Sequence, residues 1–523
     1  MKPIKMNLIK MLCCITLLIP ICSDAQEKLT IDKVYAVNLR NTGEIMEGDI
    51  VKGYYMFYQS DKIDKHTNEY TLQVLDQNLA KIKDIKFQDS KNLSLIESSY
   101  NGQAMGFLFW DDDLKQLDFR VFDTQGKKKS NYTKPVDKKT EALIAQYMEM
   151  QGEDGENKNV YDIKNKGFVN VIPVREGKQY SYEVNFYSSE SKKTWAYNPA
   201  NEEKVSTAQY LGANDSLIIL EVLKKEKLMS NEMTSWILGI NILTGKKAFE
   251  ISTTKGANKF YPINIAVREG RSEFLLIGPY YQSDDRIMQD KSEGLAIWLI
   301  DTRGKIVSEK YNSWTGQISK FLKVDKKGRL EDIGYVYFHE VLQTEDGKIF
   351  AIGEGYKKQA SAGGIALRTL ATATGSRSNV STVKLKITDM LVMQFDSKFE
   401  LENAAIYDKN SNDLNIGGTD FASPHTMALM VKAMGGFDYS FTQTTKNNAA
   451  FSTGYTDYEK GKDYKGLTFH SITYADGSVS TDKINLQTKA SKIRIYPAKP
   501  GFILISEYFK KEKRLDLRME KLN

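Results

Sequence analysis

The sequence predicts an all-β fold, a β-propeller in which antiparallel sheets stack face to face around an axis. Three features predict it: a recurring hairpin pattern, strands that are apolar on both faces, and short connections. The hairpin pattern is an apolar run, a turn of Asp or Thr before Gly, and a second run containing Lys. Clear copies turn at Gly126, Gly245 and Gly304, and degenerate copies lie at residues 395–399 and 474–478. Asp bonds its own backbone in such turns, and Gly adopts the positive φ that closes them.

Several predicted strands are apolar at consecutive positions, namely residues 216–223, 274–277 and 501–505. Both faces of such strands require burial. Parallel α/β sheets bury both faces but need a helix between successive strands, whereas the connections here are mostly short Gly, Asp and Asn turns. Antiparallel sheets stacked around an axis satisfy both constraints.

The first 25 residues predict an export signal. A basic start with Lys2, Lys5 and Lys10 precedes 13 uncharged residues, fewer than the roughly 20 that cross a bilayer. Small residues at Ser23 and Ala25 occupy the positions that a signal peptidase reads, so we expect cleavage before Gln26. We therefore expect an exported protein in the periplasm, at the outer surface or in the medium, with no membrane-spanning segment in the mature chain.

All three cysteines, Cys13, Cys14 and Cys22, lie in that segment. The mature chain would then contain no disulfide, catalytic cysteine, or cysteine-based zinc or iron–sulfur site. Lipidation of Cys22 is a minor alternative, because Ile21 stands where lipoprotein signals carry a small residue. The net charge falls from +6 to +4 on cleavage, without the clustered basic excess of a nucleic-acid binder.

The predicted hairpin turns fall near residues 77, 125, 189, 244, 303, 397 and 476, and three further strands cover 493–496, 502–508 and 515–519. The N-terminal run 33–39 could supply the fourth strand of that last blade and close the ring. The sequence therefore predicts one propeller domain over residues 26–523 with eight blades; seven is the alternative.

Two segments depart from this pattern and predict helices. The first covers 137–150, with Asp137 as the cap, and the second covers 423–434, with Pro424 in its first turn. The second carries an apolar stripe of Met427, Met430, Val431 and Met434, interpreted as bracing the propeller rather than as a methionine-rich binding surface.

A predicted insertion in the sixth blade covers about 357–386. It is rich in Ala, Thr, Ser and Gly, and its basic residues include Lys357, Lys358, Arg368 and Arg377. It could be a mobile loop or a loop that sets specificity.

Known catalytic motifs are absent from the sequence. No Gly-x-Ser-x-Gly elbow occurs, and the four histidines form no His-x3-His pair (His66, His339, His425 and His470). The acidic runs 111–113 and 284–285 lack the spacing of a calcium loop and predict solvated turns. The Gly-Lys doublets precede strands rather than helices, which identifies them as hairpin residues. We therefore assign no catalytic residue, cofactor or metal ligand, although carboxylates from different blades could still converge.

Residues 242–246 and 298–305 resemble the blade motif of the quinoprotein-like propellers, in which Asp-x-x-Thr-Gly-Lys joins two strands. This resemblance implies an eight-bladed ring. It implies no cofactor here, because the paired cysteines of the quinone-dependent dehydrogenases are lacking. As a whole, the chain resembles uncharacterised exported propeller proteins of Gram-negative bacteria.

These observations favour a monomeric, exported binding or scaffold protein whose partner is an envelope protein or a glycan, with no nucleic acid bound. The alternative is a carbohydrate-active enzyme, resembling glycoside hydrolases, whose carboxylates come from several blades. A third hypothesis is an assembly factor that binds the strands of envelope proteins at a propeller edge.

Overall fold

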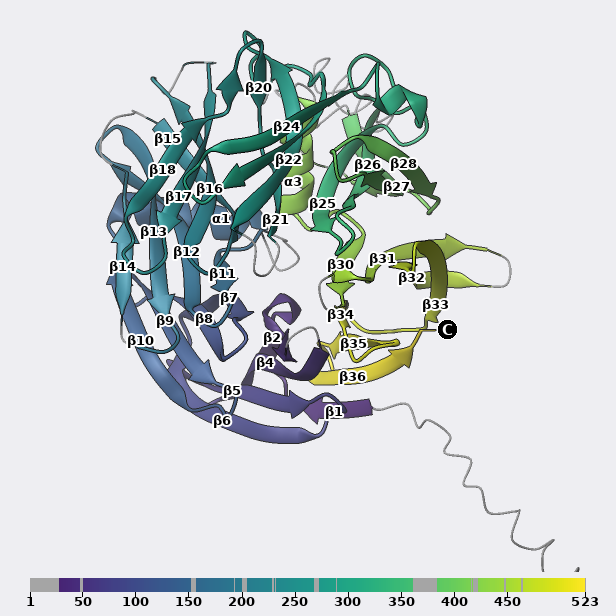
Figure 1. The fold of residues 1–523 in the computed structure, drawn as a ribbon. Helices are drawn as coiled ribbons and strands as arrows, with labels where there is room; N and C mark the ends of the chain where they lie inside the picture. Colours follow the sequence, from purple (N-terminus) through teal and green to yellow (C-terminus); the bar gives the residue numbers. More distant parts are fainter. Residues whose placement is uncertain are drawn as a thin grey trace, which may run out of the picture.

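Consecutive antiparallel hairpins stand around a common axis and form a ring (Figure 1). The structure is a computed structural model that describes residues 28–522 except for 48–49, 152–156, 192, 200–204, 228–229, 231, 268–271, 288, 361–382, 415, 417–421, 446–447 and 462–463. The expected export signal and the three cysteines lie outside the described residues.

The described strands form seven hydrogen-bonded sheets, and the eight-stranded one consists of two four-stranded units joined by a single parallel bridge, Tyr180 to Val205. The ring therefore has eight blades, as the sequence predicts. Blade 1 contains β2 (Ala36–Val37), β3 (Gly43–Glu47), β4 (Ile50–Lys62), β5 (Thr67–Asp76) and β6 (Lys81–Ser90). Blade 2 contains β7 (Leu93–Tyr100), β8 (Ala104–Asp111), β9 (Gln116–Asp123) and β10 (Lys128–Pro135). Blade 3 contains β11 (Val160–Ile163), β12 (Gly167–Glu176), β13 (Gln179–Ser188) and β14 (Thr194–Tyr197). Blade 4 contains β15 (Val205–Ala213), β16 (Leu217–Lys225), β17 (Thr234–Asn241) and β18 (Lys247–Ser252).

The second half of the ring continues this order. Blade 5 contains β19 (Thr254–Lys255), β20 (Asn258–Phe260), β21 (Asn264–Val267), β22 (Glu273–Gln282), β23 (Gly294–Asp301) and β24 (Ile306–Ser313). Blade 6 contains β25 (Tyr335–Gln343), β26 (Ile349–Ala360), β27 (Val383–Phe395), β28 (Leu401–Tyr407) and β29 (Asn412–Leu414). Blade 7 contains β30 (Tyr439–Thr444), β31 (Phe451–Lys460), β32 (Lys465–Ala475) and β33 (Ser478–Leu486). Blade 8 contains β34 (Lys492–Pro497), β35 (Phe502–Phe509), β36 (Arg514–Lys521) and β1 (Lys28–Asp32).

The strands predicted to be buried on both faces are the second strands of their blades. On β16, Leu220 packs with Val184 of blade 3, whereas the adjacent Ile219 packs with Trp298 of blade 5. Side chains alternate across a strand, so each face of the blade contributes to a different core. The core is therefore a set of layers between neighbouring blades.

The seven predicted turns all join the third and fourth strands of a blade. Gly245, in the blade 4 turn, has a φ of 67°, and a Cβ there would lie 2.6 Å from the Trp195 ring of blade 3. Gly304 of blade 5 has a φ of 79° and meets the Phe249 ring of blade 4 in the same way. Glycine is thus required both by the backbone conformation and by an aromatic ring from the preceding blade.

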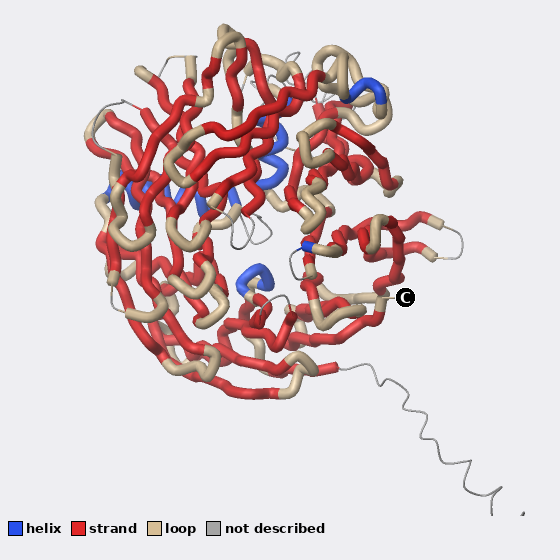
Figure 2. The backbone as a smooth tube through the Cα atoms, viewed as in Figure 1, coloured by secondary structure: helices blue, strands red, loops and turns tan. Residues whose placement is uncertain are grey.

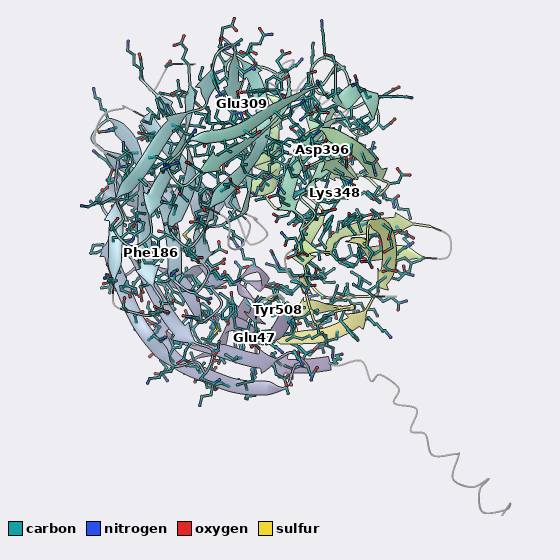
Figure 3. All side chains as sticks on the ribbon, viewed as in Figure 1. Glu47, Phe186, Glu309, Lys348, Asp396 and Tyr508 are labelled. Atoms are coloured by element: carbon teal, nitrogen blue, oxygen red, sulfur yellow. The ribbon has the colours of Figure 1, made fainter. Side chains whose placement is uncertain are left out.

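The ring closes through β1, which pairs antiparallel with β36 from Lys28 opposite Arg518 to Asp32 opposite Arg514. The prediction that residues 33–39 supply this strand is wrong by about five residues. Lys33 has a φ of 61°, which ends the strand, and β2 pairs instead with β4 of blade 1. Tyr508, labelled in Figure 3, holds the segment in which the chain passes from blade 8 to blade 1, because its hydroxyl donates to the carbonyl of Val34 at 3.2 Å.

Both predicted helices are confirmed. In α1 (Lys138–Gln151), Asp137 Oδ1 accepts hydrogen bonds from the amides of Lys139 and Thr140. In α3 (Pro424–Ala433), Ser423 is the cap and Met427 and Val431 are buried against blade 6, which agrees with a bracing helix; Met434 is exposed. No helix of the described residues is both long and apolar enough to cross a membrane.

The insertion in blade 6 is shorter than the predicted range of about 357–386. Lys357 to Ala360 pair with Val383 to Lys386 and extend the β26–β27 hairpin. Its remaining part, with Arg368 and Arg377, lies outside the described residues.

A buried charge cluster joins blades 6 and 7. The Lys409 ammonium is fully buried and lies 3.0 Å from Glu354 Oε1, and it also pairs with Asp438. The backbone amides of Asp438 and Tyr439 donate to the Glu354 carboxylate at 3.1 to 3.2 Å. Burial, followed by the Glu354 charge, raises the pKa of Asp438 to about 6.

Removing the closing strand should unfold or aggregate the protein. A chain that begins after Asp32 leaves the β36 edge unpaired and exposes the apolar residues beneath Ile31. A chain beginning at Glu27 is the control; a monomeric truncated form with unchanged melting would contradict this role of β1.

Ile31→Ala should cost about 2 kcal/mol or more of unfolding free energy, measured by urea denaturation.

Lys409→Met should cost about 3–5 kcal/mol near neutral pH, because two carboxylates would lose their buried cation. The loss should shrink as pH falls through 6, since protonation of Asp438 removes one uncompensated charge. Lys348→Met is the control, because Lys348 (Figure 3) belongs to a surface pair with Asp346 and should cost about 1 kcal/mol at most. Equal losses in the two variants would rule out a stabilising role for the cluster.

Candidate functional site

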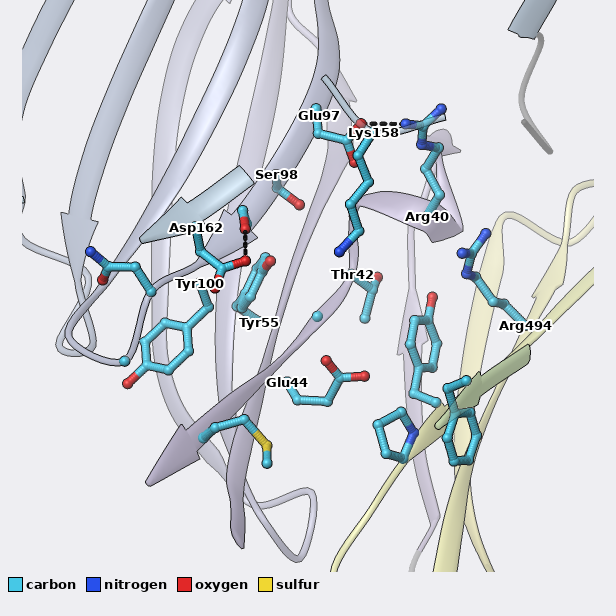
Figure 4. A pocket seen from close by; sticks show the side chains of 18 of the residues that line it. Arg40, Thr42, Glu44, Tyr55, Glu97, Ser98, Tyr100, Lys158, Asp162 and Arg494 are labelled. Carbon is cyan, nitrogen blue, oxygen red and sulfur yellow. Dashed lines mark hydrogen bonds and ion pairs between the residues drawn. The ribbon is translucent and has the colours of Figure 1, made fainter. Parts of the chain in front are cut away.

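A cavity of about 680 Å³ lies between the inner strands of several blades, and Figure 4 shows it from close by. The first strands of blades 1, 2, 3, 7 and 8 contribute its walls, together with η1 (Leu39–Asn41), which Figure 2 shows on the inner side of the ring of strands. Its charged lining residues are Arg40, Glu44, Glu47, Glu97, Lys158, Asp162, Lys164 and Arg494. Charged side chains from several blades therefore line the same cavity.

Arg40 and Glu97 form the inner wall of this cavity. Their side chains form an ion pair and are each only 6% exposed. Arg40 also donates to the carbonyl of Asn157 at 2.7 Å, and Glu97 accepts from the amide of Asn159 at 3.2 Å. Burial raises the pKa of Glu97, against the opposing charge of Arg40. This pair is satisfied internally and holds η1 against blades 2 and 3.

Glu44 is arranged differently. It comes from β3, where Ile45 points into the core between blades 1 and 2 and Glu44 points into the cavity. In Figure 4 its carboxylate faces the side chains of Lys158 and Arg494. Within the described part of the chain it forms an ion pair with neither of them. Burial raises the pKa of Glu44, and the charges of Lys158 and Arg494 partly oppose that rise.

Hydroxyl and aromatic groups complete the lining. Ser99 Oγ donates to Asp162 Oδ1 at 3.2 Å. Burial raises the pKa of the Tyr55 hydroxyl, which therefore stays protonated and able to donate. Tyr100, Phe441 and Tyr496 contribute rings to the same cavity.

A second cavity of about 860 Å³ continues the first, because Glu44, Lys158 and Arg494 line both. It extends to α3, whose Leu429 and Lys432 line it. Burial raises the pKa of Glu340, another lining residue. We call the two cavities together the central channel.

The four histidines lie in different settings. His339 lines the channel, where burial lowers its pKa, and its Nε2 lies 3.4 Å from Glu354. His425 lies in the first turn of α3, His470 lies 4.0 Å from Asp457, and His66 lies in an exposed turn. Among the residues that the structure describes, no group of three or more His, Cys, Asp or Glu side chains is placed to hold a metal ion.

The acidic runs are turns, as predicted. Asp111 Oδ1 accepts from the amides of Asp113 and Leu114, and Asp285 Oδ2 accepts from the amide of Gln282. Sequence reasoning missed Glu44, Glu97 and Asp162. The available signal was a charged residue within the first strand of a blade, the strand that faces the axis.

Solved structures similar to this chain include two propeller domains. The WD40 domain of SCAP from fission yeast is 7% identical, with 94% of both chains covered and a TM-score of 0.37. The β-propeller domain of the trilobed protease from Pyrococcus furiosus is 12% identical, with 74% of this chain and 98% of that chain covered and a TM-score of 0.32.

No curated protein matches the chain significantly. Residues 5–523 match a family described as "Family of unknown function (DUF6770)". The match extends over nearly the entire sequence, and the chain belongs to the DUF6770 family.

Proposed function

We propose that the protein is an exported binding protein that holds a glycan in the central channel. One observation carries this proposal: Glu44, Lys158 and Arg494 face one another in a cavity without pairing, beside exposed polar groups and aromatic rings. Charged groups that stop short of each other leave their hydrogen-bonding capacity to a ligand.

The chemistry of the lining fits a saccharide. Sugar hydroxyls both donate and accept hydrogen bonds, and the carboxylates, Lys158 and Arg494 supply the complementary acceptors and donors. The apolar faces of sugar rings pack on aromatic side chains, here Tyr100 and Phe441. Each of the two cavities, with volumes of about 680 and 860 Å³, lies in the range of small-ligand sites. Its recessed position favours a glycan over a protein partner.

Export is supported by the basic start, short apolar run and small residues of positions 1–25. Cleavage before Gln26 would leave the closing strand intact, because β1 begins at Lys28. The quinoprotein-like hairpins are turns between outer strands, so their resemblance adds no ligand to this proposal.

A glycoside hydrolase is the second candidate, and the raised pKa of Glu44 favours it. Glycosidases use one carboxyl group as an acid and a second carboxylate as base or nucleophile. Asp162 lines the same cavity and could take the second role.

Arg494→Met should weaken glycan binding at least tenfold, because it removes the planar donor group that faces Glu44. Polysaccharides and oligosaccharides are screened first, and the dissociation constant of the best ligand is measured by calorimetry. Arg303→Met is the matched control, since Arg303 lies in an exposed turn and pairs with Asp301; its affinity should stay within twofold. Failure of all glycans to bind, or equal weakening in both variants, would refute the channel as a glycan site.

Glu44→Gln separates the two candidates. A binding protein gives no turnover of aryl glycosides before or after the substitution. A hydrolase should lose about 100-fold or more of its turnover in the variant while still binding the ligand. Turnover that survives Glu44→Gln unchanged would exclude Glu44 as the acid.

Glu44→Gln should also change how stability depends on pH. A folded-state pKa above the usual 4.5 means that the folded protein holds this proton longer than the unfolded chain does. Ionisation of Glu44 therefore costs stability as pH rises from 4.5 through the raised pKa, and glutamine removes that cost. Relative to wild type, the variant should gain stability between pH 4 and pH 8 in urea titrations. A difference that stays constant with pH would contradict the raised pKa.

A further inference from the structure

A separate cavity of about 890 Å³ lies at the N-terminal end of α3. All six charged side chains among its lining residues are cations: Lys225, Arg286, Lys291, Arg329, Lys357 and Lys358. Lys225 ends β16, and Lys357 and Lys358 belong to β26. Arg286 and Lys291 lie in the connection between β22 and β23, and Arg329 lies in the connection between β24 and β25. Three blades thus direct positive charge into one space, in a chain whose overall charge is nearly balanced.

Carboxylates do not neutralise most of this charge. Arg286 pairs with Asp290 at 2.9 Å, whereas Lys357 and Lys358 donate to the carbonyls of Asp332 and Ala422, each at 3.0 Å. Within the described part of the chain, Lys225, Lys291 and Arg329 form no ion pair. At least three cations therefore remain for an anionic ligand.

Lys291 also lies beside another cation. Lys291 and Lys327 both line a small adjoining cavity. The neighbouring Lys327, followed by burial, lowers the pKa of Lys291, and the charge of Asp325 opposes this change. Two adjacent ammonium groups repel each other, and an anion placed between them would relieve the repulsion.

Helix α3 adds its positive end to the same cavity. Ser423, Pro424 and Thr426 of its first turn line the space, and the ten-residue helix directs its dipole there. A small adjoining cavity shares Lys291 and Pro424 and is lined by His425. The His425 Nε2 is buried and has no hydrogen-bond partner among the described residues.

We propose that this basic cavity binds a phosphate- or sulfate-bearing ligand of about saccharide size. Three observations favour an oligoanion: Lys225, Lys291 and Arg329 form no ion pair within the described part of the chain, Lys327 lies beside Lys291 in the adjoining cavity, and the first turn of α3 lines the basic cavity. The site is distinct from the central channel, because the first turn of α3 lines the basic cavity while Leu429 and Lys432 line the channel. The proposal therefore does not depend on the glycan site.

Calorimetric titration of the purified protein with tripolyphosphate and with sucrose octasulfate tests this proposal, with sucrose as the neutral probe. At least one oligoanion should bind saturably, sucrose should not, and affinity should fall as NaCl rises from 50 to 300 mM. The tighter probe identifies phosphate or sulfate as the preferred group.

Lys291→Glu should weaken that binding at least tenfold without changing the melting temperature. Lys305→Glu is the matched control, because it makes the same charge change at an exposed turn outside the cavity; its affinity should stay within twofold. Lack of saturable binding by either oligoanion, or equal weakening by both substitutions, would overturn the proposal. Arg494→Met should leave oligoanion binding unchanged, which separates this test from that of the central channel.

Discussion

The closed ring of this protein depends on the pairing of β1 with β36. Blades bury both faces against neighbours, so a ring with one unpaired end would expose an apolar face as well as a strand edge. The closing strand supplies the outer edge of blade 8 from the opposite end of the chain. Because the ring is closed, the first strands of all blades are held at fixed positions around the axis. That geometry brings Glu44, Arg494 and Lys158 together from remote parts of the sequence.

Polar groups in this ring serve two different purposes. The charges of the Lys409 cluster are paired with one another, and they hold blade 6 against blade 7. Glu44 in the channel and Lys291 in the basic cavity are not satisfied by neighbouring side chains of opposite charge within the described chain. Charged groups that pair with one another serve the structure, whereas charged groups without such a partner are candidates for ligand recognition.

Much of the fold was predictable, because it depends on local chemistry. The turns at Gly126, Gly245 and Gly304, the two capped helices and the eight-blade count all follow from short patterns. The closing strand was misplaced because the longer apolar run, Val34 to Val37, follows it, whereas the strand itself ends at the charged Asp32 and at the backbone turn of Lys33. The candidate sites were not predictable. Glu44 and Arg494 are 450 positions apart, and isolated charged residues on short strands resemble ordinary surface positions until the ring closes.

A turn glycine contacts an aromatic side chain of the preceding blade, so the two sides of this junction between blades differ. Trp195 of blade 3 fits over Gly245 of blade 4, and Phe249 of blade 4 fits over Gly304 of blade 5. Blade 4 therefore carries both halves of the contact, with Gly245 facing blade 3 and Phe249 facing blade 5. A duplicated or transplanted blade would fit only if it carried both halves of this contact.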